Sequence, residues 1–168
     1  SRRFAAAALS NLASLPKNNA EVLAAGAVVP LVALVIDRDP KSKHFAACAL
    51  GRLAACAPKE TSSDVSKDIA RAGAITPLVG LLGGASGDAA QEEAAGALFA
   101  LAGEISNRVA ITEAGGIGPL VSMLGSDNST TQKHAKGVLV RLSIESANRA
   151  LIIKKLVDML SDTGNVSA

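Results

Sequence analysis

The chain has almost no aromatic residues. Among its 168 residues there is no Trp and no Tyr, and only three are Phe, although 49% of the residues are hydrophobic. Alanine makes up the difference, because 33 residues, about one in five, are Ala. Alanine is the best helix former and most strand formers are under-used, so the composition argues against an all-β sandwich. A mean hydropathy of +0.32 with a net charge of +2 also argues against a disordered chain.

The sequence also lacks an excess of charge of one sign and a long apolar run. Seventeen Lys and Arg stand against fifteen Asp and Glu, so the whole chain has no strong attraction for nucleic acid or for an anionic membrane. The longest uncharged run, Val22 to Ile36, has fifteen residues and is interrupted by Gly26 and Pro30. It is too short and too broken to span a bilayer. We therefore expect no nucleic-acid partner and no membrane span.

Cysteine is scarce as well. Cys48 and Cys56 lie eight residues apart in one predicted helix, where a rise of about 1.5 Å per residue separates their Cα atoms by ~12 Å. That separation excludes a disulfide while the helix stands. With no signal peptide in the opening residues, the thiols indicate a reducing compartment. We expect a cytoplasmic protein, with the nucleus as an alternative.

Internal repeats dominate what the sequence does contain. Four similar segments read ALSNLA, ALGRLA, ALFALA and VLVRLS, and their aligned leucines are Leu9, Leu50, Leu98 and Leu139. These leucines are spaced by 41, 48 and 41 residues. A second block reads AGAVVPLV, AGAITPLV and AGGIGPLV, with its prolines at Pro30, Pro77 and Pro119. A period near 42 residues with two or three helices per unit is typical of an α-solenoid.

Each unit is predicted to contain three helices. The first is short and ends at a glycine suited to the left-handed conformation, and these glycines are Gly26, Gly73 and Gly115. The second carries its proline in the first turn, where a missing amide proton costs nothing. The third is the longest. No such unit can bury its apolar face alone, so neighbouring units must supply the core.

Counting along the repeats gives one domain over residues 1–168. Its predicted units are 1–17 (partial), 18–58, 65–106, 107–147 and 148–168 (partial). Leu50 to Pro77 is six residues longer than the matching intervals, which predicts an insertion loop at 58–67 on the surface. Leu139 to Lys155 is five residues shorter, so the last unit has lost or fused its first helix.

The two repeated blocks, in phase over essentially the whole chain, resemble armadillo repeats. The resemblance implies an all-α, right-handed α-solenoid of about four armadillo repeats, whose third helices line a concave groove that binds extended segments of other proteins. It implies no catalysis. Because the chain opens on a third helix (2–15) and closes just after a second helix (153–160), we expect the solenoid to be incomplete at both ends. It would then be part of a longer array, or its ends would meet another subunit.

The resemblance also selects groove positions. In family members that carry nuclear import cargo, two third-helix positions four residues apart hold a Trp and an Asn. In this chain the positions that match the Trp hold Ala7, Cys48, Gly96 and Gly137. The positions that match the Asn hold Asn11, Arg52, Ala100 and Arg141. One turn earlier come Arg3, His44, Glu92 and Lys133. Without an aromatic shelf to hold lysine side chains, the pattern argues against an import receptor.

We hypothesise that this groove takes an acidic or phosphorylated extended segment, with Arg52 and Arg141 as the main anchors. The alternative is that the basic residues are solvated charges paired with nearby acids. Gly96 and Gly137 destabilise the helices that contain them, so we expect another helix or a partner to approach the backbone closely at these two positions. Either adjacent third helices pack tightly at these glycines, or a partner helix lies on the small-residue floor.

Other chemistry is weakly indicated. The glycines of 83–87 resemble a phosphate loop but lack the following Lys-Ser/Thr. His44 and Cys48 share a helix face, yet two ligands do not make a metal site. We predict no catalytic, metal or cofactor site and no small-molecule substrate. Two other functions stay open: the substrate-recruiting region of a larger ubiquitin ligase, or a structural subunit of a large assembly held through its open solenoid ends.

Overall fold

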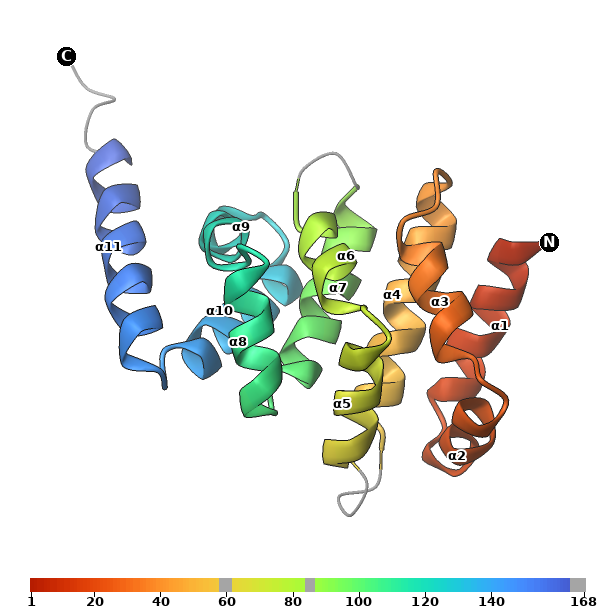
Figure 1. The fold of residues 1–168 in the computed structure, drawn as a ribbon. Helices are drawn as coiled ribbons and strands as arrows, with labels where there is room; N and C mark the ends of the chain where they lie inside the picture. The colour runs from red at the N-terminus through yellow and green to blue at the C-terminus, as the bar shows by residue number, and fades with distance from the viewer. Residues whose placement is uncertain (58–61, 84–86, 164–168) are drawn as a thin grey trace.

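The structure, a computed structural model, describes residues 1–57, 62–83 and 87–163 and is built from helices stacked in a row (Figure 1). The helices are α1 (Arg2–Ala13), α2 (Pro16–Ala24), α3 (Val28–Val35), α4 (Pro40–Ala55), α5 (Ser62–Arg71), α6 (Ile75–Leu81), α7 (Asp88–Leu101), α8 (Ile105–Glu113), α9 (Ile117–Ser122) with the 3-10 turn η2 (Met123–Gly125), α10 (Ser129–Leu142) and α11 (Ser146–Thr163). The prediction of an all-α solenoid is confirmed.

A glycine and a proline shape the turn between the first and second helix of each unit. Gly26, Gly73 and Gly115 adopt positive φ angles of 71°, 84° and 79°, a conformation that costs glycine little because it has no Cβ. Each of the next helices, α3, α6 and α9, carries its proline in the first turn, where the missing amide proton breaks no helical bond.

The core lies where the third helices α1, α4, α7 and α10 pack on one another and on the second helices. Leu50, Leu53, Leu98 and Leu101 are fully buried, and burial of each such side chain contributes about 1.5–3 kcal/mol. Ala46 and its equivalents Ala94 and Ala135 are also fully buried. Their small side chains let neighbouring helices approach closely, which accounts for much of the alanine content.

The predicted insertion loop at 58–67 is wrong for residues 62–67. Residues 58–61 lie outside the described residues, whereas Ser62–Arg71 form α5. Val65 and Ile69 lie one helical turn apart on α5, and both side chains are buried in the core. That i, i+4 spacing stabilises a helix even though the segment is otherwise polar. In the last unit, Ser146–Thr163 form one continuous helix, so that, of the two alternatives raised by the short interval before Lys155, the first helix is fused.

The apolar run of residues 22–36 is divided between α2 and α3. In the part of the chain that the structure describes, no single helix is long and apolar enough to cross a membrane, and α2 with α3 reach that length only as a pair bent by 91°. Both thiols are free, with Cys48 buried in α4 and Cys56 at its C-terminal cap. Burial raises the pKa of the Cys48 thiol.

Candidate functional site

A pocket between α7 and α10 brings several predicted groove residues together. It has a volume of about 470 Å³ and is lined by Phe99, Lys133, His134, Lys136, Gly137, Val140 and Arg141. We call it the α7–α10 pocket. Lys133 and Lys136 are exposed at its rim, whereas Arg141 is partly buried. Within the described residues, none of its three cations pairs with a carboxylate. The pocket therefore combines positive charge with an apolar wall.

Arg141 is held firmly in this pocket. Its guanidinium carbon lies 3.8 Å from the centroid of the Phe99 ring, and its Nη1 donates a hydrogen bond to the Phe99 carbonyl. Burial lowers the pKa of Arg141, with a further contribution from the nearby charge of Arg108. An arginine stays protonated at neutral pH even so. The guanidinium is thus a fixed positive charge stacked on an aromatic face.

Arg52 makes the same kind of hydrogen bond two junctions away, where α4 packs on α1. Its Nη1 donates to the Ser10 carbonyl at 2.7 Å and to Ser10 Oγ at 3.0 Å. Ser10 and Phe99 hold equivalent positions in the last turns of α1 and α7, where carbonyls lack a helical partner. Arg52 and Arg141, predicted as peptide anchors, therefore also close the C-terminal ends of the preceding third helices.

The two glycines in the groove floor are explained by packing between third helices. A Cβ on Gly96 would lie 3.1 Å from Cε1 of His134, and a Cβ on Gly137 would lie 2.6 Å from Cε2 of Phe99. A Cβ atom almost never approaches another side chain as closely as 2.6 Å. Of the two alternatives raised by the sequence, tight helix packing accounts for both positions.

The remaining predicted residues lie elsewhere along the row. Arg3 is exposed, with its guanidinium 4.7 Å from the Phe4 ring. Asn11 is exposed near the end of α1. His44 is half-buried, and its Nδ1 lies 3.2 Å from the Ala89 carbonyl.

Glu92 is engaged within the chain. Its Oε2 accepts a hydrogen bond of 2.7 Å from Nδ2 of Asn128, the residue that caps the N-terminus of α10. Of the predicted set, Lys133, Gly137 and Arg141 share the α7–α10 pocket.

Four pocket residues, His134 among them, were not predicted as site residues. Lys136 and Val140 follow Lys133 by three and seven positions on α10, so helical spacing alone places them on the same stripe. Phe99 comes from α7, and no local pattern in the sequence indicates that its ring reaches α10.

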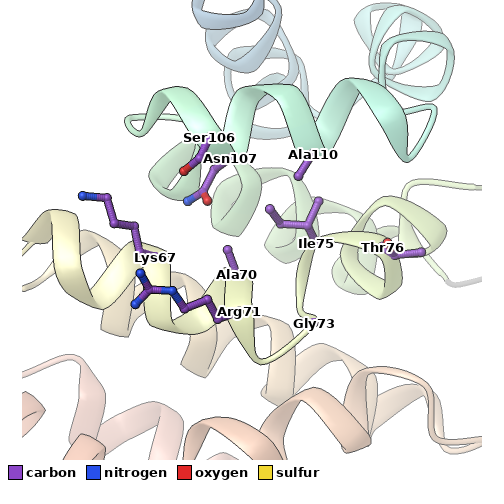
Figure 2. Close-up of a pocket in the computed structure, with 9 residues that line it drawn as sticks. All are labelled: Lys67, Ala70, Arg71, Gly73, Ile75, Thr76, Ser106, Asn107 and Ala110. Carbon is purple, nitrogen blue, oxygen red and sulfur yellow. The ribbon is translucent and has the colours of Figure 1, made fainter.

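Another pocket, of about 550 Å³, lies among α5, α6 and α8 (Figure 2). Its lining includes two cations, but both already face carboxylates. Nζ of Lys67 lies 3.7 Å from Oε2 of Glu104, and Nη1 of Arg71 lies 3.0 Å from Oδ1 of Asp68. Their charge is largely compensated, which makes this pocket a weaker candidate than the α7–α10 pocket. Among the described residues, no group of three or more potential metal ligands comes together.

Comparisons with known proteins agree with this geometry. A family model described as Armadillo/beta-catenin-like repeat matches residues 106–144. An engineered protein of known crystal structure is 32% identical, with a TM-score of 0.78, over 93% of this chain and 60% of its own length. A designed armadillo repeat protein solved in complex with a (KR)4 peptide is 26% identical, with a TM-score of 0.76, over 92% of this chain and 62% of its own length.

Among curated proteins, U-box domain-containing protein 3 from Arabidopsis thaliana is 46% identical over 50 residues. That match covers 30% of this chain and 7% of the Arabidopsis protein. The chain thus spans about three-fifths of each of these two solved structures and a small part of the curated relative.

Three-helix units stacked through their third helices define the class of α-solenoid repeat proteins. Within that class, residues 106–144 match an armadillo repeat, and the fold of the chain is similar to that of designed armadillo repeat proteins.

Proposed function

We propose that the chain is a protein-interaction module that binds an extended, acidic segment of a partner along its third helices. The observation that carries the proposal is the α7–α10 pocket, where Lys133, Lys136 and Arg141 surround the Phe99 ring without a carboxylate partner among the described residues. A carboxylate entering this pocket would gain charge-assisted hydrogen bonds.

The residues of the pocket have different roles, which changes the hypothesis that Arg141 is a main anchor for the acidic segment. Arg141 already donates to the Phe99 carbonyl, so its role is partly structural. Lys133 and Lys136 are exposed ammonium groups on flexible stems and are free to reorient toward a ligand. Val140, exposed on the same stripe, offers an apolar contact for a residue next to the acid. An acidic residue beside an apolar one is the sequence that best fits these groups.

Related scaffolds support peptide binding but differ in the peptide. One designed armadillo repeat protein was solved with a (KR)4 peptide, which is strongly basic. The α7–α10 pocket of this chain is itself cationic, so a basic peptide would be repelled. We therefore propose the same mode of binding with the opposite charge preference.

The test is a fluorescence anisotropy titration with an Asp/Glu-rich peptide and a matched Lys-rich peptide. We expect the acidic peptide to bind, with an affinity that falls as salt concentration rises. The variant Lys133→Ala/Lys136→Ala should weaken binding by roughly 2- to 30-fold, since each exposed pair is worth about 0.2–1 kcal/mol.

The matched control is Lys154→Ala/Lys155→Ala, which removes the same charge from α11 outside the pocket. This control should bind the acidic peptide as the parent chain does. Equal weakening by both variants, or preference for the Lys-rich peptide, would contradict the proposal.

A second candidate is the substrate-recruiting region of a larger ubiquitin ligase. The local match to a U-box domain-containing protein favours it. The test is a ubiquitin conjugation assay on the natural gene product with purified ubiquitin-activating and ubiquitin-conjugating enzymes. Polyubiquitin that depends on the gene product supports this candidate, and its absence with every conjugating enzyme contradicts it.

A further inference from the structure

Helix α8 carries two large apolar side chains on its outer surface. Ile105 and Val109 are 65% and 45% exposed, and they lie one helical turn apart on the same side of α8. Val109 is matched by Ala20 in α2 and by Ala150 in α11. Valine is a weaker helix former than alanine, because its branched Cβ restricts the side chain. Neither core packing nor helix formation therefore accounts for Val109.

Helix α8 lies inside the row, with other helices on both sides. It packs on α5 and α6 on one side and on α10 on the other, and Figure 1 shows it between α5 and the start of α11. Nη2 of Arg108 on α8 lies 3.8 Å from Oε1 of Glu145, the residue just before α11. The apolar pair therefore belongs to the outer surface of an interior unit.

The pocket among α5, α6 and α8 lies beside this apolar pair. Ser106 and Ala110, which line the pocket, follow Ile105 and Val109 by one residue each. Figure 2 shows Ala70 on the opposite, α5 side of the pocket. The pocket volume of about 550 Å³ lies within the range of about 300–1,000 Å³ that ligand-binding pockets have. A cavity and an apolar surface thus adjoin on α8.

Asn107 places a buried amide group at this pocket. The residue is 2% exposed, and its Nδ2 donates to the carbonyls of Ser66 and Leu101 at 3.2 and 3.0 Å. Its Oδ1 accepts no hydrogen bond from a described residue. Figure 2 shows the amide directed from α8 toward α5. Because a buried acceptor without a donor costs free energy, Oδ1 is suited to an N–H group that enters the pocket.

The charges around the pocket cancel. Lys67 faces Glu104 at 3.7 Å, and Arg71 faces Asp68 at 3.0 Å. A carboxylate that entered would approach two other carboxylates, and an ammonium group would approach two other cations. The pocket therefore gives no net attraction to an ion of either sign. A neutral side chain that has both a donor and an acceptor fits it better, since its hydration costs less to remove.

We infer that Ile105, Val109 and the adjoining pocket form a second interaction surface, which binds a partner segment with a glutamine next to an aliphatic residue. We call it the α8 surface. The carboxamide of the glutamine would donate to Asn107 Oδ1 and accept from the Ser106 hydroxyl, and the aliphatic neighbour would cover Val109. The inference goes beyond the proposed binding of acidic segments and does not depend on it, because the groove is formed by the third helices.

The experiment follows backbone and side-chain amide resonances of the isotope-labelled chain during titration with acetylated dipeptide amides. The three probes are Leu-Gln, Leu-Glu and Leu-Lys. We expect saturable shifts from Leu-Gln, centred on Ser106, Val109 and the side-chain amide of Asn107. Leu-Glu and Leu-Lys should bind roughly 2- to 10-fold more weakly, since each loses a neutral hydrogen bond and meets like charges.

Two variants test the two parts of the α8 surface. Ala110→Met fills the pocket and should abolish the shifts caused by Leu-Gln. Val109→Ala reduces the apolar contact and should weaken Leu-Gln binding about fourfold, the worth of one buried methylene group. The matched control is Ala20→Met, which adds the same side chain at an exposed position of α2 and should leave binding unchanged.

Equal affinities for the three dipeptides, or Leu-Gln shifts that persist in Ala110→Met, would overturn the inference. So would the absence of saturable shifts on α8 with Leu-Gln. Binding of an acidic peptide at the α7–α10 pocket is a separate observation, so a failure of one proposal leaves the other standing. If circular dichroism shows that Ala110→Met loses helicity, Ser106→Ala replaces it and should reduce the affinity for Leu-Gln to that for Leu-Glu.

Discussion

Neighbouring third helices are joined in two different ways. Where α4 packs on α1 and α10 packs on α7, Arg52 and Arg141 donate to carbonyls in the last turn of the preceding helix. The equivalent residue in α7 is Ala100, so the α4–α7 junction has no such arginine. There the helices come so close that a Cβ on Gly51 would lie 3.1 Å from the Cα of Ala97. The arginine junctions carry a polar cap, whereas at the α4–α7 junction the close approach is to the backbone of the neighbouring helix.

The difference follows from where each helix ends. At the end of α1, the Ser14 amide donates a hydrogen bond to the Asn11 carbonyl, and at the end of α7 the Gly103 amide donates to the Ala100 carbonyl. Each amide therefore bonds the carbonyl three residues earlier and leaves the one four residues earlier without a helical donor. Those carbonyls, on Ser10 and Phe99, are the ones that the arginines bind. Helix α4 runs to Ala55, four residues beyond Gly51, so the Gly51 carbonyl stays within the helical ladder. A longer helix therefore removes the need for an arginine.

Replacing Arg141 or Arg52, which donate to the carbonyls at the helix ends, should have the largest effect on stability. Arg141→Met leaves the Phe99 carbonyl without its donor and removes the stacked charge. We expect a loss of about 2 kcal/mol in the free energy of unfolding, since hydrogen bonds to charged groups are worth about 1.5–3 kcal/mol. Arg52→Met should cost a similar amount. Urea unfolding measures the free energy of unfolding of both variants. A loss no larger than that of Lys154→Met would show that the two arginines do not stabilise the fold.

The close junction can be tested by adding one methyl group. Gly51→Ala improves helix propensity by about 1 kcal/mol, but its Cβ would press on the backbone of Ala97, and overpacking typically costs about 1–3 kcal/mol. We expect a net loss of stability. Gly80→Ala is the control, because a Cβ there meets open space within α6 and should raise stability. Thermal unfolding of the two variants should move in opposite directions.

The two floor glycines should respond differently to alanine. A Cβ on Gly137 would overlap the Phe99 ring, which Arg141 holds in place, so Gly137→Ala should destabilise by about 1 kcal/mol. At Gly96 the nearest atom belongs to the His134 ring at 3.1 Å, a side chain that can shift. Gly96→Ala should therefore be neutral or stabilising. Equal losses in the free energy of unfolding for Gly137→Ala and Gly96→Ala, measured with urea, would contradict this interpretation of the two glycines.

The smallest expected effect concerns the start of the third helices and depends on pH. The Asp39 carboxylate caps α4 and Asn128 caps α10 in the same geometry, each accepting from two backbone amides. The hydrogen bond from the Ser42 hydroxyl, aided by those amides, lowers the pKa of Asp39. A lowered folded-state pKa contributes stability above the unfolded value of about 3.9, and this contribution is lost as pH falls through the folded value.

The parent chain should therefore lose thermal stability on acidification more steeply than Asp39→Asn, which keeps a cap that does not titrate. The control is Asp127→Asn, which removes an exposed carboxylate next to the Asn128 cap. Its melting temperature should follow the parent at every pH. Identical acid profiles for the parent and Asp39→Asn would show that this cap carries no pH dependence.

Much of the fold could be predicted from the sequence because its signals are local. The spacing of Leu9, Leu50, Leu98 and Leu139 sets the repeat, and the glycine and proline positions set the turns that the structure confirms. Only the first part of α5, residues 62–67, was assigned to a loop, because polar residues surround the buried Val65 and Ile69 pair. The candidate site was predictable only in part, since Lys133 and Arg141 follow from the groove positions that the resemblance to armadillo repeats selects. The contacts of Phe99 and Ser10 depend on where α7 and α1 end, which the repeat pattern does not specify.

Binding of acidic segments at the α7–α10 pocket is tested most directly by amide chemical shifts. An Asp/Glu-rich peptide is titrated into the isotope-labelled chain while backbone resonances are followed. We expect saturable shifts centred on Lys133, Lys136, Gly137 and Val140, and their loss in Lys133→Ala/Lys136→Ala. Shifts centred instead on the pocket around Lys67 and Arg71, or no saturable shifts at all, would contradict the proposed function.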